Sequence, residues 1–305
     1  MFSSIISPSN PRVKRVSLLK ESRVRRKTGM FLVDGTREIL RALQSEFKLV
    51  ELFWDAGNNL SADERVIVDD VLRSTYNDES RREIIKTVLE ESERLGIPII
   101  PLSSSAFGKI VFGSRNEGVV AVVRAKDTTL KELEHLLKEK VEKTDEAPLL
   151  GIVEGVEKPG NIGAILRSAD GAGVDALIIV ASSYDVFNPN TIRGSLGTIF
   201  NMPIVVAPTS EVLPWLRERA IQRVTALCDE AVPYIEIDYK LPTAIILGSE
   251  AEGLTMEWTM ETTKDIRNSL LQKVRLPMLG IADSLNVSNA AAILFYEARR
   301  VRSSS

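Results

Sequence analysis

Three short runs in the second half of the sequence combine glycine, small polar residues and very few charges. The first begins at Asn161, the second at Gly248, and the third covers residues 276–302. The loop at the start of the third run, LGIADSLNVSN, carries one charge, Asp283, and otherwise offers hydroxyls, amides and main-chain groups. Such a loop suits a small polar ligand that is bound largely by main-chain atoms. We therefore expect the three runs to form walls of one pocket.

The first run, NIGAILRSADGAG, has the pattern of a helix that begins beside a binding site. Asn161 is a residue type preferred at helix N-caps. An apolar stripe recurs at helical spacing, at Ile162, Ile165, Leu166 and Ala169. Arg167 falls outside that stripe, and an arginine near free N-terminal amides suits a phosphate. Two plainer interpretations stay open: Asn161 only caps the helix, and Arg167 only forms a surface ion pair.

A pattern found in dinucleotide-binding folds, G-x-G-x-x-A, occurs at Gly171, Gly173 and Ala176. In those folds it lies between a strand and the following helix, whereas here it follows a helix and precedes an apolar strand. We therefore predict a helix end and a turn at these glycines, and not a nicotinamide-dependent dehydrogenase.

The second run, AIILGSEAEGL, is a buried strand followed by a tight loop. Gly248 would let main-chain atoms approach a ligand closely. Glu250 is either an acceptor for a ribose, a residue that orients the loop, or a solvated acid. The run lacks the Lys-Ser/Thr ending of a P-loop, so nucleoside triphosphate binding is not predicted. The stretch FNPNTIRGSLGTIF adds Arg193 and Ser195 as a weaker candidate cation and hydroxyl.

Composition limits the chemistry that the protein can perform. The 305 residues include one cysteine, Cys228, and one histidine, His135, which lies in a charged helical pattern. A metal site of the usual Cys/His kind, an intrachain disulfide and catalysis by a histidine base are therefore not expected. No apolar run approaches the roughly 18–20 residues that a membrane span requires, so no membrane partner is expected.

Positive charge concentrates near the amino terminus, although the formal net charge is −3. Within residues 1–30 a single acid, Glu21, stands among basic residues: Arg12, Lys14, Arg15, Lys20, Arg23, Arg25, Arg26 and Lys27. Such a cluster can neutralise nucleic-acid phosphates. A solvated basic helix and an organelle transit peptide are the alternatives, but the segment continues without a boundary into the next strand.

Two α/β domains and a linker account for the rest of the pattern. In residues 1–125 we expect an α/β sandwich with strands at 31–33, 49–54, 97–100 and 118–124 and helices at 12–25, 36–47, 81–95 and 103–110. Pro98 makes the third of these strands an edge strand or a strand start. Residues 57–80 read as a polar loop with a helix at 62–76, and residues 126–147 as a charged linker helix.

Residues 148–305 have the pattern of a parallel sheet flanked by helices. Continuous apolar runs, typical of strands covered on both faces, occur at 149–153, 176–181, 204–207, 224–228, 244–247 and 274–276. Helices are expected at 162–172, 211–222 and 285–301. Ligands bind such sheets at the carboxyl ends of the strands, which is where the three runs lie.

Taken in order, the three runs resemble the SpoU (TrmH-type) branch of the SPOUT methyltransferases. The motifs are NIGAILRSADGAGVDALI, AIILGSEAEGL and LPMLGIADSLNVSNAAAILFYEARR. The resemblance implies a deep trefoil knot, an S-adenosylmethionine pocket, a homodimer with shared active sites, and methyl transfer to a ribose 2′-hydroxyl in RNA. It leaves the segments 57–80 and 255–273 unexplained.

The resemblance also implies roles for single residues. Main-chain groups of Gly248, Leu276 and Leu285 would bind the cofactor, with Met278 and Asn286 nearby. Arg167 would engage the RNA phosphate. The residues implied to build and orient the site are Asn161, Glu250, Ser284 and Asn286.

The N-terminal run NPRVKRVSLLKESRVRRKTGMFLVDGTREILRAL resembles the RNA-binding domain of several members, except that Asp34 stands where they often have Glu. We expect ribosomal RNA as the partner and a cytoplasmic protein, with organelle import left open. The residues predicted to contact RNA are Arg12, Arg23, Arg25, Arg26, Lys27, Arg193 and Ser195. Transfer RNA as the substrate, and an RNA-binding protein without catalysis, are the alternatives.

Overall fold

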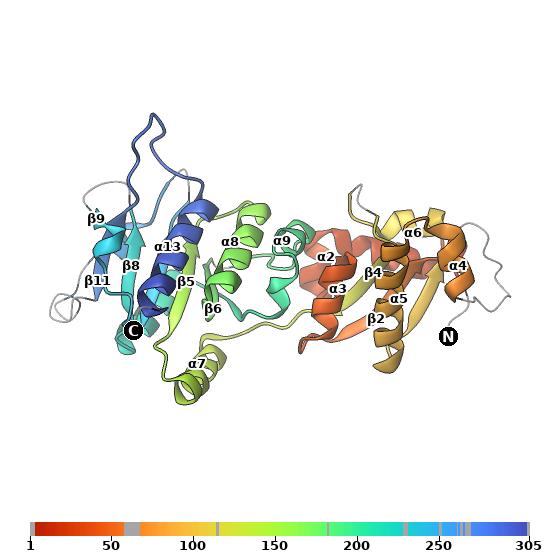
Figure 1. The fold of residues 1–305 in the computed structure, drawn as a ribbon, viewed down its shortest axis with the longest axis horizontal. Helices are drawn as coiled ribbons and strands as arrows, with labels where there is room; N and C mark the ends of the chain where they lie inside the picture. Colours follow the sequence, from red (N-terminus) through yellow and green to blue (C-terminus); the bar gives the residue numbers. More distant parts are fainter. Residues whose placement is uncertain are drawn as a thin grey trace. The chain divides into compact units, whose positions relative to one another are not determined.

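The chain forms two compact units in a computed structural model (Figure 1). The model describes residues 4–57, 68–113, 116–181, 183–227, 231–249, 252–260, 262, 265 and 270–303. The first unit combines Met1–Lys126 with Asp185–Asn201, and the second combines Asp127–Tyr184 with Met202–Ser305. The chain therefore crosses between the units three times, and not once through a linker. Within the described residues, every helix is too short or too polar to span a lipid bilayer.

The first unit contains a four-stranded sheet in the order β1-β4-β2-β3. Its strands are β1 (Met30–Asp34), β2 (Leu49–Asp55), β3 (Ile99–Leu102) and β4 (Val119–Arg124). β4 is antiparallel to β1 and β2, whereas β3 pairs parallel with β2. β3 ends the sheet, as Pro98 predicted, because proline cannot donate to a neighbouring strand.

Helices cover the sheet of the first unit. They are α1 (Pro11–Ser17), α2 (Ser22–Thr28), α3 (Thr36–Leu43), α4 (Val68–Thr75), α5 (Glu79–Arg94) and α6 (Ser104–Ile110). The single helix expected at 12–25 is in fact two helices and a 3-10 turn, because Glu21 has extended backbone angles. Of the helix expected at 62–76, α4 is observed, while residues 58–67 lie outside the described part of the chain.

The stretch 185–201 joins the first unit through an aromatic cluster. It contains α9 (Pro189–Gly194) and the 3-10 helix η2 (Thr198–Phe200). Phe187 stacks on Phe31 of β1 with 4.2 Å between ring centroids, and Phe200 meets Phe47 edge-on at 5.3 Å. Burying four rings together stabilises this arrangement beyond simple area burial. This unit therefore differs from the expected domain 1–125 by a segment from the second half of the sequence.

The second unit contains a seven-stranded sheet in the order β7-β6-β5-β10-β8-β11-β9. Every pairing between these strands is parallel, which confirms the predicted sheet type. The strands are β5 (Leu149–Glu154), β6 (Ala176–Val180), β7 (Ile204–Ala207), β8 (Gln222–Ala226), β9 (Val232–Pro233), β10 (Thr243–Leu247) and β11 (Leu271–Arg275).

Helices lie on both faces of this sheet. On one face α7 (Leu130–Thr144) and α10 (Thr209–Glu218) bury Leu133, Leu137 and Trp215 against Leu150 and other strand residues. α7, expected as a linker, therefore belongs to the core of the second unit. On the other face α8 (Pro159–Ala172) packs beside α13 (Val287–Ser303), as Figure 1 shows.

Residues 255–273, which the family resemblance left unexplained, supply a partner for a buried charge. α11 (Met256–Thr259) lies in this stretch, and Asp265 follows it. Asp265 forms an ion pair of 2.8 Å with Arg223 of β8, and both side chains are almost fully buried. Burial raises the pKa of Asp265, but hydrogen bonds from Thr262 and the charge of Arg223 outweigh it, so the pKa lies below its ordinary value. An unpaired charge at Arg223 would be costly in this position.

The close packing of α13 against β5 in the second unit is made possible by a glycine. A Cβ atom on Gly151 of β5 would lie 2.8 Å from the Phe295 ring of α13. Ala291 and Ala298 of α13 are also fully buried. Tight packing of α13 thus depends on glycine in the facing strand as well as on the alanines that the sequence suggested.

Gly151→Ala is therefore expected to lower the free energy of unfolding by about 1–3 kcal/mol, the usual range for overpacking a core. Gly160→Ala in the same unit is the control, because a Cβ atom there meets nothing within 4 Å. It should leave stability within about 0.5 kcal/mol of wild type. Urea unfolding measures both, and equal stability of the two variants would contradict the packing argument.

Candidate functional site

The three polar runs leave the sheet of the second unit at one edge. β5 and β10 are neighbours in the sheet. From β5 the chain proceeds to β6 on one side, and from β10 it proceeds to β11 on the other side, beyond β8. Ligands of parallel α/β sheets bind outside the carboxyl ends of strands at such a reversal. Because all pairings are parallel, the loops that follow β5, β10 and β11 share this edge.

The first run forms α8, which begins earlier than expected. Pro159 is its first residue and Lys158 occupies the N-cap position, so Asn161 lies inside the first turn and is not the N-cap. The side-chain oxygen of Asn161 instead accepts a hydrogen bond from Asn286 Nδ2 at 3.3 Å. The predicted apolar stripe is buried, and Arg167 is exposed. Gly173 ends the helix in a left-handed conformation, as predicted from the glycine pattern.

The second run forms a closed loop after β10. Ser249 N donates to Gly253 O at 3.2 Å, and Gly253 N donates to Ser249 O at 3.0 Å. A Cβ atom on Gly248 would lie 2.2 Å from the carbonyl carbon of Gly253 and 2.5 Å from Leu254 N, so only glycine fits there. Glu250 lies outside the described residues.

The third run is an extended loop that leads into α13 (Figure 1). Leu276, Met278 and Leu285 are half-buried, whereas Ser284 and Asn286 are exposed. These five residues lie in the loop that connects β11 to α13. Their main-chain groups and neutral side chains would bind a cofactor without charged contacts.

Asn286 links this loop to its surroundings. Its side-chain oxygen accepts hydrogen bonds from Ser288 N at 3.0 Å and from the Ser288 hydroxyl at 2.6 Å, which caps the start of α13. Together with its bond to Asn161, this joins the first run to the third across 125 positions of sequence.

Glu154 is a residue at this edge that sequence reasoning missed. It ends β5 and its carboxylate is buried. The available signal was an acid that closes an otherwise apolar strand, LLGIVE, immediately before the first run. Among the described residues no group of three or more His, Cys, Asp or Glu could bind a metal ion.

Three residues predicted to contact RNA are engaged inside the first unit. Arg25 is buried, donates to the carbonyls of Leu19 and Lys20 at 2.8 and 2.7 Å, and forms an ion pair with Asp185. Arg193 and Ser195 are the other two.

Arg193 donates to the Asp34 carboxylate at 2.8 Å and to the carbonyl of Phe112. Burial raises the pKa of Asp34, while the hydrogen bond from Phe112 N and the charge of Arg193 oppose that rise. Ser195 is fully buried and donates to Ile192 O at 2.8 Å. These contacts favour a structural role for Arg25, Arg193 and Ser195.

The other cationic residues predicted to contact RNA differ in how accessible they are to a phosphate. Arg12 donates to Glu51 at 2.6 Å and is partly buried. Arg23, Arg26 and Lys27 are exposed on α2. Exposed cations on one short helix can bind phosphates without breaking existing pairs.

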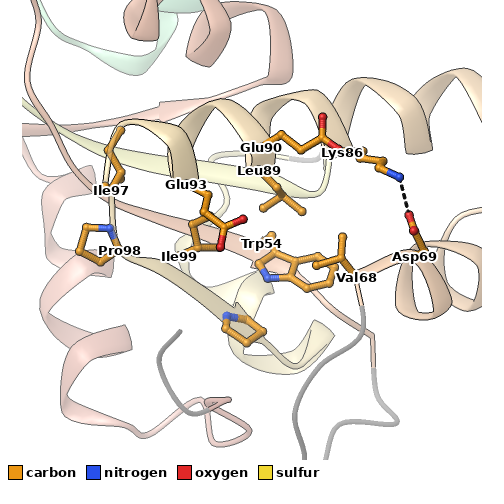
Figure 2. A pocket seen from close by; sticks show the side chains of 12 residues that line it. Trp54, Val68, Asp69, Lys86, Leu89, Glu90, Glu93, Ile97, Pro98 and Ile99 are labelled. Atoms are coloured by element: carbon orange, nitrogen blue, oxygen red, sulfur yellow. Dashed lines mark hydrogen bonds and ion pairs between the residues drawn. The ribbon is translucent and has the colours of Figure 1, made fainter.

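A pocket of about 530 Å³ in the first unit lies between α5 and the β2–β3 edge (Figure 2). Trp54 and Leu89 contribute apolar surface, and Lys86 pairs with Asp69 at 2.9 Å. Glu90 and Glu93 add further negative charge. Carboxylates repel phosphate, so this pocket does not fit a nucleic-acid backbone, and we assign it no role in RNA binding.

Comparison with known protein families and structures agrees with this geometry. Residues 148–296 match the SpoU rRNA Methylase family and residues 10–121 match the MRM3-like substrate binding domain. A 23S rRNA (uridine(2479)-2′-O)-methyltransferase of Streptomyces viridochromogenes is 28% identical, over 94% of this chain and 88% of that protein.

Two further similarities extend the comparison. A 23S rRNA (guanosine-2′-O-)-methyltransferase of Bordetella pertussis is 31% identical, over 76% of this chain and 90% of that protein. The crystal structure of an AdoMet-bound rRNA methyltransferase from Sinorhizobium meliloti has a TM-score of 0.77 and 25% identity, with 98% of both chains covered. The order of the motifs, the parallel sheet and these similarities agree: the chain belongs to the SpoU rRNA methylase family, within the SPOUT fold.

Proposed function

We propose that this protein transfers a methyl group from S-adenosylmethionine to a ribose 2′-hydroxyl of 23S ribosomal RNA. The hydrogen bond between Asn161 and Asn286 carries the proposal, because it joins the first motif run to the third. The choice of ribosomal RNA rests on the relatives, whose names identify them as 23S rRNA 2′-O-methyltransferases.

The residues present fit such a cofactor. When bound, S-adenosylmethionine supplies a methyl group on a positively charged sulfur. Gly248 has no room for a side chain, because the main chain of Gly253 and Leu254 lies where a Cβ atom would be. At this position only main-chain atoms would contact the cofactor. Main-chain groups near Leu276 and Leu285 continue this wall, with Met278 close to them in sequence. A trefoil knot, expected for the family, would hold these loops together.

Arg167 would bind the phosphate next to the reacting ribose. Its exposed position on α8 leaves the guanidinium accessible to RNA. A guanidinium stays protonated and has no acceptor for a further proton. We infer that Arg167 fixes the phosphate and that the hydroxyl proton leaves to an oxygen of that phosphate. Asn161, Glu250, Ser284 and Asn286 would orient the ribose and the loops, and correct positioning accounts for much of the rate.

The exposed cations of α2 would also bind RNA. Arg23, Arg26 and Lys27 carry three positive charges on one short helix of the substrate-binding unit. Because the substrate is ribosomal RNA in this proposal, we also propose a cytoplasmic location.

We further propose a homodimer through the second unit. Leu279 and Ile281 in the third run are 98% and 105% exposed. Leaving a large apolar side chain in water forgoes about 1.5–3 kcal/mol relative to burying it. A second copy of the chain would cover both side chains and complete the wall of the site.

The reaction is tested by mapping 2′-O-methylation in 23S rRNA. Cells that lack this protein should lose the mark at a specific nucleotide, and the wild-type gene should restore it. Arg167→Ala should fail to restore it and should lower methyl transfer in vitro more than tenfold, about 1.4 kcal/mol, because the phosphate is no longer fixed.

Arg300→Ala, which removes an exposed arginine from α13, is the control and should behave as wild type. Arg167→Ala activity within tenfold of wild type would remove Arg167 from the mechanism. Loss of methylation in transfer RNA instead of 23S rRNA would replace the substrate, and unchanged methylation in both would favour an RNA-binding protein without catalysis.

Replacing Arg23, Arg26 and Lys27 together by alanine should weaken RNA binding while leaving cofactor affinity intact. Each lost phosphate contact should reduce the slope of log K against log salt by about 0.7–0.9. The matched control removes three exposed lysines of α7: Lys131, Lys138 and Lys143. Filter binding at several salt concentrations measures the slope. If the slope of log K against log salt is the same for both triple variants, the net charge of the protein, and not the α2 surface, sets the affinity for RNA.

The dimer is tested with Leu279→Ser/Ile281→Ser, which should give a monomer in sedimentation equilibrium at micromolar concentration. Ile235→Ser, at another exposed apolar side chain of the second unit, is the control and should remain dimeric. A wild-type protein that sediments as a monomer would refute the proposed dimer.

A further inference from the structure

Glu154 is a buried acid whose carboxylate is surrounded by neutral hydrogen-bond donors. Its side chain stands at the carboxyl end of β5, and the residue is 9% exposed. Oε2 accepts from Thr255 N at 2.8 Å. Oε1 accepts from Trp258 Nε1 at 2.9 Å, from the Thr255 hydroxyl at 3.1 Å and from the Thr209 hydroxyl at 3.3 Å.

These donors compensate a charge that would otherwise be expensive to bury. Within the described part of the chain, no lysine or arginine forms an ion pair with Glu154. Hydrogen bonds to an ionised acceptor are roughly twice as strong as those between neutral groups. The arrangement therefore binds the segment that supplies Thr255 and Trp258 firmly to the end of β5.

That segment is the exit of the loop that contains Gly248. The loop enters from β10, whose last residue, Leu247, is paired with Val153 of β5. Hydrogen bonds between Ser249 and Gly253 close the loop, Gly248 lies against Gly253, and Thr255 follows two residues after Gly253. Both ends of the loop are thus attached to β5, the entrance through the strand ladder and the exit through the Glu154 carboxylate.

The residue after Glu154 is also packed against this loop. Gly155 has a left-handed conformation with φ +67°, and a Cβ atom there would lie 3.2 Å from Ser249 Cβ. Trp258, whose Nε1 donates to Glu154 Oε1, is fully buried. A change at Glu154 would therefore act on the loop 248–254 from its exit, while Ser249 limits how far the loop can move towards β5.

We propose that Glu154 is a positioning residue that holds the two described ends of this loop, 248–249 and 252–254, in place for binding the cofactor. This inference rests on the proposed function, because it assigns that loop to the S-adenosylmethionine site. Glu154 acts through Thr255 and Trp258 and does not itself touch the reacting atoms.

Glu154→Gln tests the proposal with almost no change of shape. Thr255 N and Trp258 Nε1 are donors that cannot reverse, and they contact different oxygens of Glu154. Glutamine has one acceptor oxygen and one NH₂ group, so in either orientation one N–H donor faces another donor. Glu157→Gln is the control, since Glu157 is exposed and lies three residues further along the same connection.

Calorimetry should show that Glu154→Gln binds S-adenosylmethionine at least tenfold more weakly, while Glu157→Gln binds as wild type. The KM for the cofactor should rise by a similar factor, whereas kcat at saturating cofactor and RNA affinity should stay close to wild type. A merely structural role would lower kcat and stability, and it would leave the ratio of the KM for the cofactor to the KM for RNA unchanged.

Trp258→Phe provides a second route if the glutamine variant does not fold. It removes the Nε1 donor and keeps an aromatic ring in place. Its effect on cofactor affinity should be smaller than that of Glu154→Gln. The two effects should be non-additive, because both changes affect the same hydrogen bond, that between Trp258 Nε1 and Glu154. Cofactor affinity equal to wild type in folded Trp258→Phe and Glu154→Gln would overturn the positioning role.

The indole N–H resonance of Trp258 in a nitrogen-15 NMR spectrum separates this result from a failure of the proposed function. That resonance should shift in Glu154→Gln without any cofactor. If the Trp258 resonance shifts in Glu154→Gln but cofactor affinity is unchanged, the hydrogen bond to Glu154 exists and the positioning role is overturned. A wild-type protein that binds no S-adenosylmethionine overturns the proposed function and, with it, the assignment of this loop.

Discussion

The parallel ladder between β5 and β10 is the constraint on which the site depends. Its register runs from Thr243 opposite Leu149 to Leu247 opposite Val153. Because both strands end at the same edge, the helix that follows β5 and the loop that follows β10 begin side by side. A shift of one residue would turn the apolar side chains of β10 to the opposite face of a sheet that is covered on both faces. The cost of that shift fixes the site as firmly as it fixes the core.

Around this ladder the protein uses main-chain atoms and neutral side chains in place of charge. Asn286 caps α13 and donates a hydrogen bond to Asn161, and the position of Gly248 has no room for a side chain. Glu154, a buried acid near the site, accepts hydrogen bonds from neutral donors of its own unit. Such a site is suited to a sulfonium cofactor, and in the proposed reaction Arg167 and cations elsewhere would recognise the phosphate.

The first unit is built from two separate stretches of chain. Phe31 and Phe47 need Phe187 and Phe200 from the stretch 185–201 to complete their cluster, and Arg25 needs Asp185. Cations in a basic run are therefore not equivalent: Arg25 has a structural task, whereas its neighbours Arg23 and Arg26 remain exposed. The covalent path through 185–201 also means that the substrate-binding unit is joined to the second unit by more than a linker.

Local patterns were sufficient for the long apolar strands, the order of the motifs and the helix stop at Gly173, because periodicity, turn residues and glycine act over a few positions. They placed β5 and α13 within two residues of their observed limits but missed α9 and β9, which are too short to show a period. Only the folded chain decided that Asn161 faces Asn286, that Arg25 and Arg193 are engaged internally, and that Glu154 holds the loop after β10. Each of these pairs residues far apart in sequence, and such partners are selected by packing, which no local pattern records.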